Sequence, residues 1–363
     1  MSRWQSRVMQ ATSPTTSLLG GGGIAHLPLQ REPTWQADVH PSKILKMVYR
    51  TDKRNRLFWE LAADYKKNCA KTETMVACPL CLTEYNLANV AELTREHIVP
   101  SKLGGRSETL TCRKCNNNQG SYLDSHLINL MKSLDAVEGA GPIRTSVISD
   151  KGKITAELLL GAGTPDEPIA IQIVGQASNM GAVENLRSIM CDGATLKLKM
   201  KFPFIPERYV RAAFRAAFLS VFKVEGYEYA LSLGAEQVRN MLGTATPVLK
   251  NVVMEAFPER DPGTDLLVMP ASFTDIGEYY AVLLRLETKR TRFISVFLPG
   301  KHGRDWTALE ALYHQAPRLR LETTPGGSNS KLYIRFGCSP MVRFQKGLQD
   351  RFIPASHRSL KVD

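Results

Sequence analysis

The spacing of hydrophobic residues predicts a short run of elements between residues 91 and 134. Residues 91–100 read as an extended segment that ends at Pro100, and residues 102–105, with two glycines, supply the turn that brings the chain back. Beyond residue 116 the leucines recur at helical spacing, which predicts a helix with one apolar face. The residues of that face are Leu123, Leu127, Leu130 and Leu134. The expected order is therefore strand, turn, strand and helix.

Beyond residue 135 the hydrophobic pattern changes to a mixture of strands and helices. A hairpin is predicted around residues 150–152, and a long helix over residues 206–222 that begins at Pro206. The apolar face of this helix consists of Val210, Phe214, Phe218 and Phe222. The helical pattern continues over residues 227–243. Further strands are predicted at residues 168–176, 194–202, 266–270, 279–287, 292–300 and 331–337.

These patterns predict the α+β fold class, with a small N-terminal module followed by a larger mixed α+β domain. No internal repeat of fixed period is present in the sequence. The 363 residues, 43% of them hydrophobic, suffice for two domains with cores of their own. A glycine pair within residues 324–328 predicts a turn rather than a phosphate-binding loop, because no Lys-Ser/Thr pair follows it.

Basic residues are concentrated on the N-terminal side of the small module. The chain has a net charge of +12, and residues 43–71 hold nine lysines or arginines against three acids, a net +6. Such an excess suggests a polyanionic partner. The window also has apolar residues at helical spacing, which predicts a helix packed on the module: Leu57, Phe58, Leu61 and Tyr65. Its basic face is either only solvated or contacts phosphates, and the candidate contacts are Lys53, Arg54 and Arg56.

Cysteine usage and hydropathy indicate the compartment. Three of the seven cysteines, Cys69, Cys191 and Cys338, are scattered, so no disulfide framework is expected and a reducing, cytoplasmic location is the natural reading. No apolar segment is long enough for a signal peptide or a membrane span, so no membrane association is expected. Residues 1–42 contain four consecutive glycines and no acid before Glu32, which predicts a flexible tail. An organelle transit peptide and a segment that covers an active site are the alternatives.

Two Cys-x-x-Cys pairs frame the predicted strands. The first pair is Cys78 with Cys81 and the second is Cys112 with Cys115. Thirty residues lie between the two pairs. Four thiolates arranged tetrahedrally suit one zinc ion, whereas disulfides or chance spacing are the alternatives. The equal spacing of the two pairs favours zinc. Four cysteines leave no open coordination position, so this zinc would be structural.

Between the cysteine pairs lies the motif Glu-His-Ile-Val-Pro, and three asparagines follow the last cysteine. With these motifs, residues 75–135 resemble the HNH endonucleases of the ββα-metal fold, in the branch that reads Cys-x-x-Cys, Glu-His-Ile-x-Pro, Gly-Gly and Cys-x-x-Cys-Asn. The resemblance implies that His97 is the general base and that Glu96 and Asn116 are ligands of a catalytic divalent metal. The family commonly has asparagine at the position of Thr109, whose hydroxyl can orient the His97 loop instead.

The chemistry of phosphodiester hydrolysis suits these residue types. It needs a base that takes a proton from water near neutral pH, for which a neutral imidazole is well matched. It also needs a hard cation, and Mg²⁺ or Mn²⁺ accepts a carboxylate and an amide oxygen together with several waters. Asn117 is the alternative ligand, since asparagines also serve as helix caps. His126 on the predicted helix would add a ligand, touch phosphate, or do neither.

The sequence therefore predicts a metal-dependent DNA endonuclease of HNH type with a structural zinc. By family analogy, the expected biological role is restriction or anti-phage defence. The alternatives are an effector nuclease gated by a nucleotide signal and a non-catalytic zinc module that binds nucleic acid. The expected organisation is a tail over residues 1–42, a nuclease domain over residues 43–135 and an α+β domain over residues 136–363. The last domain would supply specificity, sensing or the contacts of a homo-oligomer.

Overall fold

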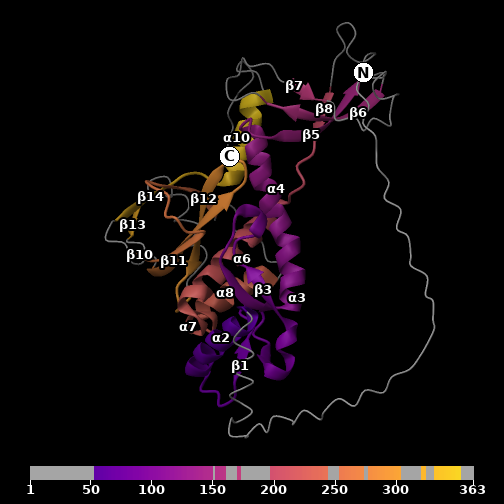
Figure 1. The fold of residues 1–363 in the computed structure, drawn as a ribbon. Coiled ribbons are helices and arrows are strands. Elements are labelled where there is room, and N and C mark those ends of the chain that lie inside the picture. Colours follow the sequence, from indigo (N-terminus) through magenta and orange to yellow (C-terminus); the bar gives the residue numbers. More distant parts are fainter. Residues whose placement is uncertain are drawn as a thin grey trace, which may run out of the picture. The chain divides into compact units, whose positions relative to one another are not determined.

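The elements of this chain follow the predicted order through the small module and then form two antiparallel sheets (Figure 1). The six-stranded sheet packs on α6 (Pro206–Glu225), and the four-stranded sheet contacts α4 (Tyr122–Val137). The computed structural model describes residues 53–149, 152–160, 170–172, 197–243, 253–273, 277–303, 320–323 and 331–352. The predictions for residues 1–42, for Cys191 and for the turn at residues 324–328 lie outside the described residues.

The small module begins with a helix and two short hairpins. α2 packs against β1, which pairs with β2, and β3 pairs in antiparallel register with β4, from Leu93 opposite Cys112 to His97 opposite Glu108. The bounds are α2 (Lys53–Cys69), β1 (Met75–Ala77), β2 (Glu84–Asn86), the 3₁₀ turn η1 (Leu87–Glu92), β3 (Leu93–His97), the 3₁₀ turn η2 (Ser101–Leu103) and β4 (Glu108–Cys112). The predicted strand, turn and strand are confirmed.

One continuous helical stretch follows β4, and it contains a widened turn. α3 (Arg113–Cys115) leads into η3 (Asn116–Ser121), which has π-helical hydrogen bonding, and then into α4 (Tyr122–Val137). The predicted apolar face of α4 is confirmed, because all four of its leucines are buried. The π turn is a local feature that the leucine spacing does not reveal, and such turns often lie at functional sites.

The central helix of the second part is α6 (Pro206–Glu225). It starts at the predicted proline and ends at Gly226, which has a left-handed φ of 64°. A Cβ at that glycine would lie 2.1 Å from the Asp64 carboxylate, which accepts a hydrogen bond from the Tyr227 amide. Almost all of α6 between Tyr209 and Phe222 is buried, not only the predicted face. The predicted helix over residues 227–243 is two helices, α7 (Tyr227–Ala230) and α8 (Leu233–Gly243).

Two antiparallel sheets complete the described part of the chain. A four-stranded sheet has the order β7-β6-β5-β8, and a six-stranded sheet has the order β10-β11-β12-β9-β14-β13. The predicted hairpin is formed by β5 and β6, with Ser149 opposite Gly152. The bounds are β5 (Pro142–Ser149), β6 (Gly152–Leu159), β7 (Ala170–Gln172), β8 (Lys197–Met200), β9 (Val253–Pro258), β10 (Leu266–Phe273), β11 (Gly277–Glu287), β12 (Thr291–Pro299), β13 (Arg320–Thr323), β14 (Leu332–Phe336) and the last helix, α10 (Pro340–Phe352).

One large hydrophobic core runs through both of the predicted domains, and a second, smaller cluster lies where α2, β1, α6 and α7 meet. α6 packs against α4 on one side and against strands β10, β11 and β12 on another. Leu110, Leu127, Phe214 and Val282 all belong to this core. The α+β fold class is confirmed, and none of the helices that the structure describes is long and apolar enough to cross a bilayer. The packing of α6 places the second part of the chain directly behind the small module.

Candidate active site and metal centre

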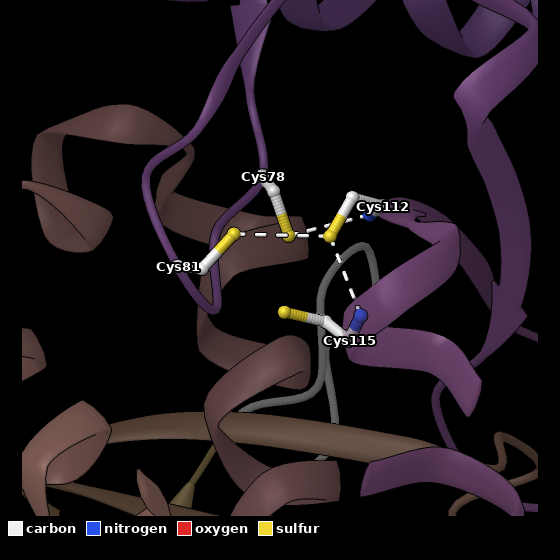
Figure 2. Close-up of side chains that lie close together, drawn as sticks. All are labelled: Cys78, Cys81, Cys112 and Cys115. Atoms are coloured by element: carbon white, nitrogen blue, oxygen red, sulfur yellow. Dashed lines mark hydrogen bonds between the residues drawn. The ribbon is translucent and has the colours of Figure 1, made fainter. Parts of the chain in front are cut away.

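The four cysteines of the two pairs form one cluster. Their sulfur atoms all lie within 4.8 Å of one another and point toward a common centre (Figure 2). The Sγ atoms of Cys81 and Cys112 are 3.7 Å apart. A tetrahedron with zinc–sulfur bonds of ~2.3 Å has edges of ~3.8 Å, so the sulfur set fits a zinc ion.

Local backbone geometry prepares this cluster. Cys78 and Cys81 flank a tight turn in which Leu82 has a left-handed φ of 59° and donates its amide to the Cys78 carbonyl at 2.8 Å. The amides of Cys112 and Cys115 each donate to a cluster sulfur, Cys78 Sγ and Cys112 Sγ, at 3.3 Å. Amides that donate to sulfur stabilise the thiolate form, which is the form that binds metal.

A cleft of about 420 Å³ is lined by β3, by the loop that follows it and by the helical stretch that follows β4. The strand β3 contributes Glu96 and His97, and the helical stretch contributes Asn116 and Asp124. Other lining residues are Arg95, Pro100, Ser101, Lys102, Ser125, Ile128, Asn129 and Lys132. The three residues assigned to catalysis by resemblance are therefore brought to one cleft.

Glu96 is a buried carboxylate, with 4% of its surface exposed. Its Oε1 lies 2.8 Å from Nη2 of Arg215 on α6, and the same guanidinium lies 3.6 Å from Oδ1 of Asp124. Oε2 of Glu96 is buried and has no hydrogen-bond partner among the described residues. A buried carboxylate oxygen without a donor is costly, and a cation in the cleft would satisfy it.

The side-chain amide of Asn116 is oriented by its neighbours. Its Nδ2 donates to Thr94 Oγ1 at 2.9 Å, and the Thr94 hydroxyl donates to the Thr111 carbonyl at 3.3 Å. Oδ1 therefore faces the other way, toward Gly120. A Cβ at Gly120 would lie 2.7 Å from Asn116 Oδ1 and 3.3 Å from Glu96 Oε1. The two oxygens and Nη2 of Arg215, which lies 3.1 Å from the same position, thus surround one point beside the π turn.

The carboxylate of Asp124 is the third oxygen-bearing side chain of the cleft, after those of Glu96 and Asn116. Burial raises the pKa of Asp124 to about 7, an effect that the Arg215 guanidinium opposes and the Glu96 charge strengthens. Asp124 follows Asn116 by eight residues on one helical stretch. Glu96, Asn116 and Asp124 form an oxygen donor set of the kind that Mg²⁺ and Mn²⁺ prefer.

His97 lies at the rim of the cleft, with 42% of its side chain exposed. Its Nε2 is 3.4 Å from Oε1 of Glu108, its register partner on β4. Glu108 also pairs with Lys53 at 2.7 Å and with Arg95 at 3.6 Å. Burial acts to raise the pKa of Glu108, but these cations and His97 together hold it below its ordinary value. Glu108 is therefore an anionic partner for the imidazole.

The other residues of the small module that the sequence singled out for the catalytic site do not line this cleft. Thr109 is buried and is the register partner of Glu96 on β4. His126 is not among the lining residues, and its Nδ1 accepts the Ile205 amide at 3.1 Å. Asn117 is exposed and also does not line the cleft.

The basic residues of α2 have a separate setting. Lys53 and Arg56 line a different hollow of about 630 Å³, where equal numbers of acidic and basic side chains meet. Arg56 also lies 3.8 Å from Glu60 one turn along the helix. Arg54 is only partly exposed. The basic side chains that line the cleft with His97 are instead Arg95, Lys102 and Lys132.

The sequence patterns did not single out Asp124, Glu108 or Arg215. The signal for Asp124 was its spacing of about two turns from Asn116. The signal for Arg215 was a charged residue inside an almost wholly apolar helix, because a buried charge requires a partner. Glu108 could be found only from the strand register that places it opposite His97.

Comparison with known proteins supports the resemblance in this region. Residues 78–132 match the sequence model of the HNH endonuclease family. No curated protein and no solved structure gives a significant match to the chain. The chain thus carries an HNH endonuclease domain at residues 78–132, which is the domain of a nuclease that acts on nucleic acid.

Proposed function

We propose that this chain is a metal-dependent endonuclease that hydrolyses phosphodiester bonds in DNA. The observation that carries the proposal is the meeting of Glu96, His97 and Asn116 in one cleft beside a four-cysteine cluster. A module that only binds nucleic acid has no need of a base and an oxygen donor set in the same cleft. Their juxtaposition therefore favours catalysis over the non-catalytic alternative.

In this proposal His97 takes the proton from the attacking water. Nε2 lies 3.4 Å from Oε1 of Glu108, so a proton on Nε2 would face that carboxylate and Nδ1 would act as the base. Glu96 and Asn116 hold the divalent metal, with Asp124 beside them. A bound Mg²⁺ or Mn²⁺ would neutralise charge on the phosphate and on the departing oxygen. Thr109, the register partner of Glu96 on β4, would orient the His97 loop through its hydroxyl.

The charge of the cleft suits a polyanionic substrate. Arg95, Lys102 and Lys132 line it together with the two carboxylates. Lys102 and Lys132 are exposed, so their ammonium groups are available to phosphates that flank the cleavage site. Restriction or anti-phage defence is the proposed biological setting, and it rests on family analogy alone.

The proposal is tested by incubating the full-length protein with supercoiled plasmid and Mg²⁺ or Mn²⁺. Nicked or linear product is expected, and EDTA should abolish it. Glu96→Ala should raise the Mg²⁺ concentration needed for half-maximal rate, because a ligand is lost while the base remains. Glu84→Ala is the matched control, since that glutamate lies on β2 and pairs with Lys71 outside the cleft. Plasmid binding without cleavage in either metal would make the chain a non-catalytic zinc module.

A further inference from the structure

Arg215 is a buried arginine that reaches the HNH domain from outside it. It lies on α6, well beyond the matched residues 78–132, and only 1% of its surface is exposed. α6 packs against α4, so the Arg215 side chain meets the rear of the β3 and α4 residues that form the cleft. Arg215 itself does not line the cleft.

The guanidinium spans two carboxylates. Nη2 lies 2.8 Å from Glu96 Oε1, and Nη1 lies 3.6 Å from Asp124 Oδ1. Both contacts are ion pairs, since neither Nη2 nor Nε of Arg215 has a hydrogen-bond partner among the described residues. A planar, delocalised guanidinium can face two acids at once, so it can hold them in a defined relative orientation. A lysine ammonium is a single point charge and cannot reproduce that geometry.

The same arginine lies beside the point that the two proposed metal ligands face. A Cβ at Gly120 would be 3.1 Å from Arg215 Nη2, 2.7 Å from Asn116 Oδ1 and 3.3 Å from Glu96 Oε1. Arg215 therefore fixes Glu96 on the side where it faces Asn116. Because the arginine approaches from the buried side, it leaves the open side of the cleft to metal and substrate.

We infer that Arg215 is a positioning residue of the nuclease site, which holds Glu96 and Asp124 from behind so that Glu96 and Asn116 form one metal-binding pair. The inference rests on the proposed function. It makes the second part of the chain a component of the active site, because α6 belongs to that part and also packs against the six-stranded sheet.

The test compares full-length wild type with Arg215→Gln and Arg215→Lys. Mn²⁺ binding is measured by the electron paramagnetic resonance signal of the free ion, and cleavage is measured at saturating Mn²⁺. Zinc content and cooperative melting verify that each variant is folded. Arg211→Gln, one turn earlier on α6, is the matched control, because Arg211 donates to the Leu242 carbonyl and does not line the cleft.

Arg215→Gln should weaken Mn²⁺ binding about 10-fold or more, as loss of a group that orients a metal ligand does. Arg215→Lys should bind Mn²⁺ with an affinity between those of wild type and Arg215→Gln, and Arg211→Gln should match wild type. If Arg215→Gln fails to fold, Arg215→Lys decides. A folded Arg215→Lys, or a folded Arg215→Gln, that binds Mn²⁺ as tightly as wild type overturns the inference. If wild type neither binds Mn²⁺ nor cuts DNA, the proposed function itself fails, which is a distinguishable result.

Discussion

Nε2 of His97 lies 3.4 Å from Oε1 of Glu108, and the two residues are register partners on strands β3 and β4. The hairpin therefore holds the largely buried Glu108 carboxylate against the His97 imidazole, which lines the cleft. In a neutral histidine the hydrogen bond made by one ring nitrogen determines which nitrogen keeps the proton. We therefore expect Glu108 to orient the ring so that Nδ1 is the basic nitrogen.

Replacing that carboxylate tests its orienting role. Glu108→Gln should lower the cleavage rate about 10-fold, because the amide holds the imidazole less firmly. The Mg²⁺ concentration for half-maximal rate should not change, since Glu108 is not a proposed ligand. The measurement is single-turnover cleavage over a Mg²⁺ titration, with Glu84→Gln as the control on β2. An unchanged rate would leave Glu108 as only a partner for Lys53 and Arg95.

The cysteine cluster should contribute to folding rather than to chemistry. Cys112→Ser should lose zinc and unfold the HNH domain, because binding a structural zinc is coupled to folding of its site. Metal analysis and circular dichroism check this result. The matched control is Cys69→Ser, since Cys69 is a free cysteine at the end of α2 and outside the cluster. Active protein that contains no zinc would contradict the assignment.

The basic residues of the cleft and those of α2 are expected to contribute differently to DNA binding. If Lys102 and Lys132 contact phosphates, replacing each by glutamine should weaken binding to every duplex sequence and reduce the salt slope by about 0.9 per lost contact. The same change at Lys53 should have a smaller effect, because that side chain already pairs with Glu108. Fluorescence anisotropy at several salt concentrations measures the slopes. A larger effect at Lys53 would contradict this assignment and indicate that the DNA contacts α2 instead.

A hydrogen-bonded aspartate ties the turn before β4 to the second part of the chain. Asp265 accepts the amides of Arg106 and Ser107 at 2.8 and 2.7 Å, and the Ser107 hydroxyl at 2.8 Å. Burial acts to raise the pKa of Asp265, but these donors hold it below its ordinary value. Asp265→Asn should therefore lower the free energy of unfolding at pH 7 by about 1–2 kcal/mol.

The sign of the pH dependence follows from the lowered pKa. A carboxyl whose pKa is lower in the folded state stabilises the protein above its unfolded-state pKa, and this contribution disappears as the pH falls through the folded-state pKa. The difference between wild type and Asp265→Asn should therefore shrink below about pH 4. Urea unfolding of both proteins at pH 7, 5 and 3.5 measures this difference in the free energy of unfolding. A difference that grows toward acid would contradict this role.

Much of the small module could be predicted from the sequence, because its signals are local. The paired cysteines predict a cluster, the leucine spacing predicts α4, and Pro100 with the glycines that follow predicts the turn between β3 and β4. Pro206 likewise predicts the start of α6. Each of these features depends on the conformation of a few neighbouring residues.

The remaining features depend on contacts between distant segments. Arg215 meets Glu96 only because α6 packs behind α4, and no local pattern specifies that packing. The strands β9 and β13 and the helix α10 were not predicted either, and β9 lies inside the six-stranded sheet between β12 and β14. The hollow lined by Lys53 and Arg56 shows the same limit, since the acids that balance them come partly from α6 and α7.

The measurement that tests the account most directly is the pH dependence of single-turnover DNA cleavage by wild type and His97→Ala at saturating Mg²⁺. The alanine variant should keep its zinc and its DNA binding but cut about 10²-fold more slowly or worse, because a positioned base contributes that much. The fall of the wild-type rate toward acid should disappear in His97→Ala and persist in Asp124→Asn, which removes the cleft carboxyl whose pKa burial raises. An alanine variant that cuts as fast as wild type, with the same pH profile, would contradict the assignment of His97 as the base.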